Sequence, residues 1–107
     1  MKAKDKVKRD NLLVEFLLNH KGQENAVNRY DIADFLTSKG FLQSASTVHG
    51  VIAKIIEERH LPICSLNGKG YFWAKSKDDI LVSIAELESR IEALKEHISF
   101  LENFIIY

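Results

Sequence analysis

The residues best suited to catalysis or metal binding in this sequence are four histidines and one cysteine. The histidines lie at positions 20, 49, 60 and 97, and the cysteine is Cys64. Zinc sites use Cys and His ligands at short, regular spacings, and these residues fall on different predicted elements. Cys64 lies in an apolar run without an evident activating base, so we expect it to pack. The sequence therefore predicts no catalytic residue, metal or cofactor and indicates that the protein is not an enzyme.

A second group of residues with polar or charged side chains lies at the start of a helix predicted to follow Ser44. A helix that enters the major groove presents the exposed residues of its first turns to the bases. Hydroxyls bond bases or phosphates, and histidine donates to acceptors such as the guanine edge. Ser44 also suits the N-cap, which we expect to be its primary role, and Thr47 has the alternative of bonding its own backbone. The candidate residues are Ser44, Ser46, Thr47, His49 and Lys54.

Basic residues elsewhere suit contacts with phosphates. Arg29 lies at the start of a predicted helix, where backbone N–H groups also favour anions. Lys69 lies at the tip of a predicted hairpin. A tail-like cluster, either solvated or able to reach an adjacent strand, comprises Lys2, Lys4, Lys6, Lys8 and Arg9.

The net charge of zero conceals an asymmetry along the chain. Residues 1–76 contain 12 Lys and Arg against 8 Asp and Glu, whereas residues 77–107 contain 3 against 7. A neutral protein can therefore present a basic part to a polyanion. The alternative interpretation is an ordinary solvated surface.

Apolar residues at helical spacing predict two helices in the first 40 residues. The first runs from about 5 to 20. After a short strand at 26–27, Asn28 suits the N-cap of a second helix at 29–38, which Gly40 ends. The residues expected to face inward are Leu13, Phe16, Leu17, Ile32, Phe35 and Leu36.

A third helix and a β-hairpin follow. The helix reaches about Arg59, and its Val48, Ile52 and Ile55 share one face. Two apolar runs, 63–66 and 71–74, flank the hairpin signal Asn67-Gly68, because both of these residues tolerate positive φ. This order of elements predicts that residues 1–76 form a mainly α winged helix-turn-helix domain with a small β-hairpin wing. The aromatic residues expected to pack this wing onto the helices are Tyr71, Phe72 and Trp73.

The sequence of residues 77–107 predicts one long coiled-coil helix. Ser76 and Asp79 form a capping box, and no Pro or Gly follows as far as Tyr107. Ile and Leu alternate by four and three residues, a heptad pattern typical of coiled coils. We expect this stripe to form a homodimer; the alternative is a helix folded back on its own domain. The stripe comprises Ile80, Ile84, Leu87, Ile91, Leu94, Ile98, Leu101 and Ile105.

The flanking charges favour an antiparallel pair. Parallel pairing places Arg90 against Lys95 of the partner, whereas antiparallel pairing brings Glu88 near Lys95. An apolar tip would also be exposed at the far end of a parallel rod, and in an antiparallel pair it returns to the partner's domain. This tip comprises Phe100, Phe104, Ile106 and Tyr107.

From Ser44 to Trp73 the sequence resembles the winged helix-turn-helix domain at the N-terminus of biotin repressors. The matching pieces are Ser44-x-x-Thr47-Val48, Leu61-Pro62-Ile63 and Gly68-x-Gly70-Tyr71, in register with Ile52 and Ile55. The part from Pro62 onward is also similar to small phage-encoded helix-turn-helix proteins. The resemblance implies that the serine and threonine open a recognition helix and that Gly-Tyr belongs to the wing. Where the family often has basic residues after Thr-Val, this chain has His49-Gly50.

Together these features predict a dimeric protein that binds double-stranded DNA. We expect a small bacterial or phage transcriptional regulator, or an accessory protein acting at a specific DNA site. The alternative is a protein–protein adaptor that uses the winged fold and the rod without DNA. No apolar run is long enough to span a bilayer, a single cysteine suits a reducing compartment, and no small-molecule signature is evident. The expected location is cytoplasmic.

Overall fold

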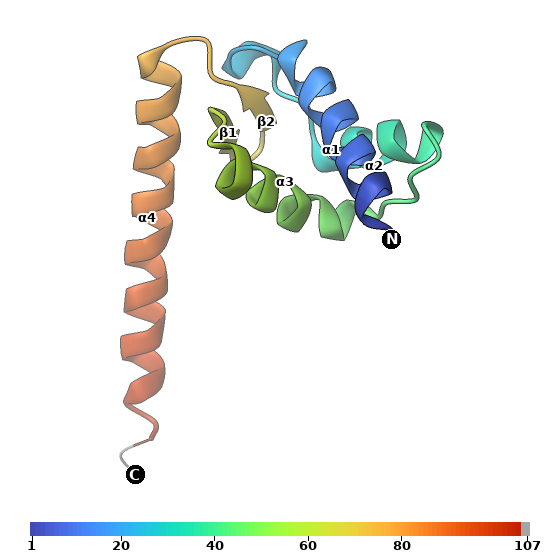
Figure 1. Cartoon of the computed structure of the whole chain (residues 1–107). Coiled ribbons are helices and arrows are strands. Elements are labelled where there is room, and N and C mark those ends of the chain that lie inside the picture. The colour runs from blue at the N-terminus through green and yellow to red at the C-terminus, as the bar shows by residue number, and fades with distance from the viewer. Residues whose placement is uncertain (106–107) are drawn as a thin grey trace.

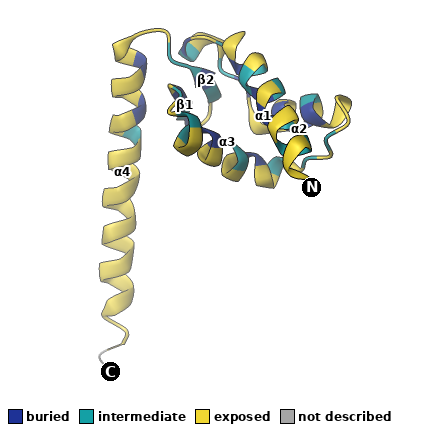
Figure 2. Cartoon of the chain, in the orientation of Figure 1, coloured by how far each residue is buried: buried dark blue, intermediate teal, exposed yellow. Residues whose placement is uncertain are grey.

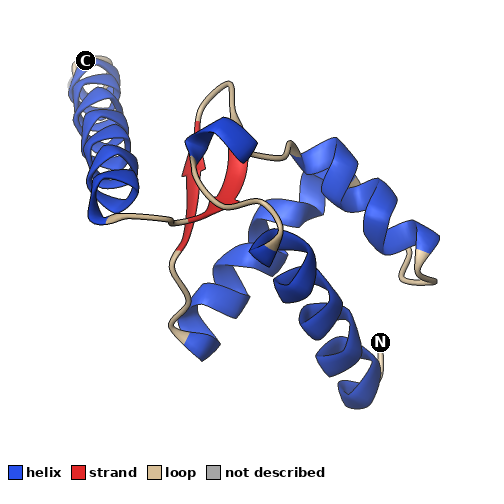
Figure 3. Ribbon diagram, turned by 90° about the horizontal axis from the view of Figure 1, so that it is seen from above, coloured by secondary structure: helices blue, strands red, loops and turns tan. Residues whose placement is uncertain are grey.

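The structure, a computed structural model of the whole chain, describes residues 1–105 (Figure 1). Within these residues the chain forms four α-helices, a short 3-10 helix and a two-stranded antiparallel sheet. Three helices pack together with the hairpin, whereas the last helix stands beside them as a long rod (Figures 1 and 3). The prediction of a mainly helical chain with a hairpin and a long C-terminal helix is confirmed. The elements are α1 (Ala3–Leu18), η1 (Gln23–Asn25), α2 (Arg29–Ser38), α3 (Ala45–Arg59), β1 (Ile63–Leu66), β2 (Gly70–Trp73) and α4 (Lys77–Glu102).

The core lies among α1, α2 and α3 and is built from residues at helical spacing. Val48, Ile52 and Ile55 of α3 are at most 2% exposed, as their spacing predicts. Phe16 and Phe35, which the spacing also places inside, are only half-buried. Their rings stack on each other with centroids 4.2 Å apart, which leaves one side of the pair open. The other fully buried members are Leu13, Leu17, Ile32 and Leu36.

The helix boundaries follow the predicted caps with one exception. α2 has the predicted bounds, and the Asn28 side chain accepts a hydrogen bond from the Asp31 N–H at 2.9 Å. Ser44 occupies the N-cap position of α3, but its side chain makes no capping bond. The Ser44 hydroxyl instead pairs with the hydroxyls of Ser46 and Thr47, so the predicted capping role is wrong. α1 begins and ends two residues before the predicted span of 5–20.

The hairpin is tied to the segment before α2. Val27 and Tyr71 exchange two backbone hydrogen bonds of 2.8 Å, so the strand predicted at 26–27 is reduced to one bridge. Glycine is required at position 70, where the hairpin passes Val27. Its φ is +109°, and a Cβ would lie 2.3 Å from the Val27 oxygen. Phe72 is fully buried, and Tyr71 and Trp73 pack partly against the helical core. The expectation that these aromatics hold the hairpin to the helices is confirmed for Tyr71 and Trp73, whereas Phe72 is buried in a separate cluster with Cys64 and Leu66 of the hairpin.

The turn of the hairpin differs from the predicted Asn-Gly type. Gly68 has a φ of +81°, whereas Asn67 is not among the residues with positive φ. The Lys69 N–H donates to the Leu66 oxygen at 3.0 Å. Leu66 pairs with Gly70, so three residues form the loop.

α4 is attached to the hairpin by polar contacts at spacings of four and three residues. Asp79 accepts hydrogen bonds from the Lys75 N–H at 2.9 Å and from Gln23 at 3.2 Å. The Ser83 hydroxyl donates to the Ser65 oxygen at 3.2 Å, and Glu86 accepts from the Asn67 N–H. The Ser76 side chain caps the helix through the Asp79 N–H, as predicted.

Most of the heptad stripe of α4 is turned away from its own domain, and Leu87 lines a crevice with Ile56 of α3. The helical members of the stripe are between 39% and 56% exposed, and α4 is solvent-exposed beyond its first turns (Figure 2). The helix ends at Glu102, earlier than predicted, so Ile105 lies beyond its end. Ile106 and Tyr107 of the predicted apolar tip lie outside the described residues. Within residues 1–105, no helix combines the length and apolarity needed to cross a membrane.

Candidate nucleic-acid interface

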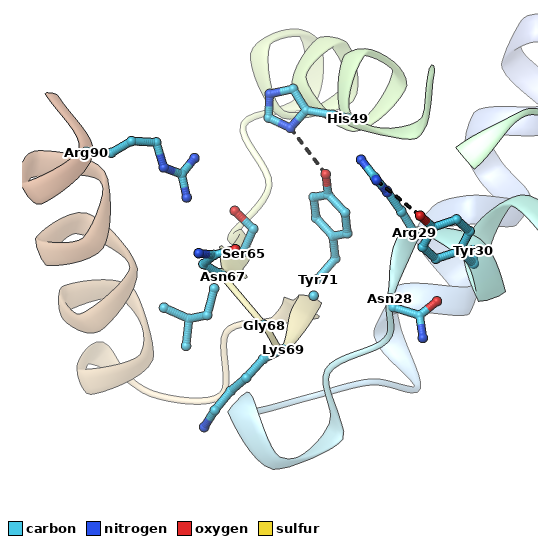
Figure 4. Close-up of a pocket in the computed structure, with 12 residues that line it drawn as sticks. Asn28, Arg29, Tyr30, His49, Ser65, Asn67, Gly68, Lys69, Tyr71 and Arg90 are labelled. Carbon is cyan, nitrogen blue, oxygen red and sulfur yellow. Dashed lines mark hydrogen bonds between the residues drawn. The ribbon is translucent and has the colours of Figure 1, made fainter. Parts of the chain in front are cut away.

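A hollow of about 550 Å³ lies where the start of α2, α3, the hairpin and α4 meet (Figure 4). None of the twelve described residues that line it is acidic. Arg29 and Arg90 face it from separate elements, so the hollow is suited to an anion, and the Glu86 carboxylate beside it binds Arg90. The charged and titratable residues of its lining are Arg29, Tyr30, His49, Lys69, Tyr71 and Arg90.

Arg29 is the first residue of α2, and its guanidinium is held by the neighbouring ring. The group lies 5.2 Å from the centroid of Tyr30 and donates to the Tyr30 hydroxyl at 3.2 Å. This hydrogen bond raises the pKa of Arg29. The side chain therefore remains a cation with most of its N–H donors unused.

His49 connects α3 to the hairpin. Its Nδ1 lies 3.2 Å from the Tyr71 hydroxyl (Figure 4). Burial raises the pKa of Tyr71, and the charges of Arg29 and Arg90 oppose that shift. The phenol therefore stays protonated at neutral pH and can donate to His49, whose Nε2 remains for another partner.

Lys69 lies at the tip of the hairpin and is exposed. Its side chain extends outward from the loop (Figure 4). Among the described residues no carboxylate pairs with it, so its ammonium group is open to an external anion.

The hydroxyls at the start of α3 lie outside this hollow. The Thr47 hydroxyl donates to the Ser44 oxygen at 2.9 Å and accepts from the Gln43 amide. Thr47 thus makes the local backbone bond that was the alternative to base contact. Lys54 is exposed farther along α3 and does not line the hollow. Arg29, His49 and Lys69 all line the hollow, with the Lys69 side chain extending away from the other two, and Ser44, Ser46, Thr47 and Lys54 do not line it.

The basic N-terminal cluster is helical rather than tail-like. α1 begins at Ala3, and Lys6 pairs with Glu58 at 3.2 Å. Arg9 pairs with the buried Asp10 at 3.0 Å. The start of α1 lies far from the hairpin in both views (Figures 1 and 3). Lys6 and Arg9 therefore bind within the fold.

Arg90 is a charged lining residue that sequence reasoning did not assign to the site. Spacing along the chain gives only its helical partner Glu86, four residues earlier, to which it donates at 2.8 Å. Its place beside the hairpin follows from how α4 docks on Ser65 and Asn67. The spacing of residues within α4 does not predict that Arg90 lies beside the hairpin.

Comparisons of the chain with family models, curated proteins and solved structures give no match. Within residues 1–105, no group of three or more His, Cys, Asp or Glu is placed to hold a metal ion. A proposal about function therefore depends on the geometry of the hollow and on the sequence pattern around it.

Proposed function

We propose that this chain is a double-stranded DNA-binding protein with a winged helix-turn-helix fold. In this proposal α3 is the recognition helix and the β1–β2 hairpin is the wing. The order of elements supports the assignment, as does the resemblance of Ser44–Trp73 to the biotin-repressor domain. We further propose a cytoplasmic homodimer that serves as a small bacterial or phage transcriptional regulator or site-specific DNA accessory protein.

The hollow beside α3 is the observation that carries the proposal. Arg29 lines it from α2, Lys69 extends outward from the adjoining hairpin loop, and its described lining contains no acidic residue. Cations on separate elements match a phosphate backbone, which passes several parts of a bound protein at once. His49 lies on the exposed side of α3, where it can reach a base edge.

Salt dependence of duplex binding tests this proposal directly. Titration of a mixed-sequence duplex at several salt concentrations should show affinity falling steeply with salt, because phosphate contacts release counterions. Arg29→Ala and Lys69→Ala should each lower the slope by about one unit. Lys39→Ala is the matched control, since Lys39 caps the other end of α2 and lies over the Phe35 ring.

The structure also supplies an observation in favour of a protein adaptor. The Thr47 hydroxyl is occupied by local hydrogen bonds, and the heptad stripe of α4 offers an apolar surface to another protein. The same titration separates the two functions. Undetectable duplex binding at low salt would reject the DNA function and leave the adaptor.

A further inference from the structure

A chain of three polar groups joins the hairpin loop to α4. The Asn67 N–H donates to both carboxylate oxygens of Glu86, at 2.8 and 2.9 Å. The Oε1 atom of Glu86 also accepts from the Arg90 guanidinium at 2.8 Å. Glu86 therefore fixes two things at once: the position of α4 against the loop, and the direction of the Arg90 side chain.

Arg90 keeps donors for another partner after this bond is made. A guanidinium has five N–H groups, and Arg90 uses one atom of its fork on Glu86. The side chain is 49% exposed and reaches from α4 toward the hairpin (Figure 4). Arg29 lines the same hollow from α2, so two guanidinium groups from two elements face it, whereas the Lys69 ammonium group points away from it (Figure 4).

We infer that Arg90 binds a phosphate group in the hollow together with Arg29, and that Glu86 is the residue that positions it. The phosphate is assigned to the DNA backbone, and in this respect the inference rests on the proposed function. α4 then belongs to the DNA interface, although its overall charge is acidic. The bidentate fork of arginine suits a phosphate oxygen pair.

Replacement of Arg90 tests the phosphate contact. Arg90→Gln should weaken binding of a mixed-sequence duplex and lower the salt slope by about one unit. Lys95→Gln removes the same charge from the same helix at a residue outside the hollow, paired with Glu92 at 3.4 Å. The salt slope of the Lys95→Gln variant should match that of the unmodified protein. Equal changes in the salt slope of the two variants would show that Arg90 acts only through the overall charge of the protein, and would overturn the inference.

A double-variant cycle tests the positioning role of Glu86. Glu86→Gln retains a carbonyl oxygen that can accept from the Asn67 N–H, so α4 stays docked while the carboxylate for Arg90 is lost. In this background, Arg90→Gln should change the slope by less than half as much as in the unmodified protein. The same loss in both backgrounds would show that Glu86 does not position Arg90. Unchanged far-ultraviolet circular dichroism establishes that each variant folds.

Inorganic phosphate distinguishes the source of the ligand. It should perturb NMR signals of the hollow residues weakly, and Arg90→Gln should reduce that perturbation. A different outcome is that the unmodified protein binds no duplex while phosphate still perturbs the NMR signals of the hollow in a way that depends on Arg90. In that case the proposed function fails, and the hollow binds a free phosphate compound. If neither duplex nor phosphate binding depends on Arg90, the inference itself is wrong.

Discussion

Gly50 is an exposed glycine inside α3 that the fold of the single chain does not require. A Cβ at this position would meet nothing within 4 Å. A glycine inside a helix costs about 1 kcal/mol of stability relative to alanine. Close approach of an external backbone to α3, in our proposal a DNA strand, gives a physical reason for it.

Replacing this glycine should separate stability from binding. Gly50→Ala should raise the free energy of unfolding by about 0.5–1 kcal/mol, because alanine favours the helix. If DNA approaches α3 here, the added methyl group should also weaken duplex binding. Urea unfolding and a duplex titration measure the two effects. A stabilised variant that binds duplex as tightly as the unmodified protein would show that nothing approaches α3 at this point.

Asp79 is a buried carboxylate whose ionisation is coupled to the docking of α4. Hydrogen bonds from the Lys75 N–H and, more weakly, from Gln23 lower the pKa of Asp79 below its ordinary value of 3.8. Because the folded state binds the proton less tightly than the unfolded state, Asp79 stabilises the fold above that value. This contribution is lost as the pH falls through the lowered pKa.

The pH dependence of unfolding checks this role. Asp79→Asn should lower the urea midpoint at pH 7 and reduce the difference between the midpoints at pH 7 and pH 3. Asp78→Asn is the matched control, because Asp78 is an exposed neighbour in the same turn. A loss in Asp79→Asn that is the same at both pH values would assign the effect to packing instead of ionisation.

At the scale of the element, the two glycines of the hairpin loop differ in what their backbone must accommodate. Both have positive φ, +81° at Gly68 and +109° at Gly70. A Cβ on Gly68 would meet nothing within 4 Å, whereas one on Gly70 would lie 2.3 Å from the Val27 oxygen. The first position has only a conformational requirement, and the second also has a steric one.

The two alanine variants should therefore differ in stability. Gly68→Ala should cost about 1 kcal/mol from the unfavourable φ. Gly70→Ala should cost more than about 2 kcal/mol, because the backbone bonds between Val27 and Tyr71 must also break. Thermal unfolding of both variants gives the comparison. Similar losses would mean that the hairpin moves away from Val27 at little cost.

Local signals predicted most of these elements, and long-range contacts determined the rest. The spacing of Val48, Ile52 and Ile55 correctly gave the buried face of α3, and Asn28 gave the start of α2. The hairpin turn was predicted incorrectly in detail, since the Asn67 N–H bonds to Glu86 on another element. Arg29, His49 and Lys69 were predicted as site residues, whereas the place of Arg90 in the hollow could not be predicted, because it depends on how α4 packs beside the loop.

At the scale of the whole molecule, the long helix gives the chain an extended shape and an exposed apolar surface. The molecule measures 53 × 34 × 23 Å, and the 26 residues of α4 span about 39 Å. The polar contacts at Asp79, Ser83 and Glu86 occupy one side of this helix, so the heptad stripe beyond Leu87 is left exposed in the single chain. An exposed apolar stripe of this kind is the surface that the proposed dimer would bury.

The dimer proposed above should depend on the middle of this stripe. Ile91 and Leu94 are 49% and 56% exposed, so aspartate at both positions leaves the packing of the single chain intact. Sedimentation should give a dimer for the unmodified protein and a monomer for the Ile91→Asp, Leu94→Asp variant, because two buried charges would oppose pairing. A wild-type monomer at micromolar concentration would reject the dimer.

The direction of pairing is open to a separate test at the end of α4. Phe100 and Phe104 are 62% and 69% exposed, with ring centroids 5.6 Å apart. An antiparallel partner would bring this pair back toward an apolar crevice of about 160 Å³ between α3 and α4, lined in part by Ile56 and Leu87. We therefore expect Asn103→Cys, in a Cys64→Ser background, to resist oxidation to a disulfide-linked dimer. Rapid disulfide formation on mild oxidation would place the two ends side by side and establish a parallel rod.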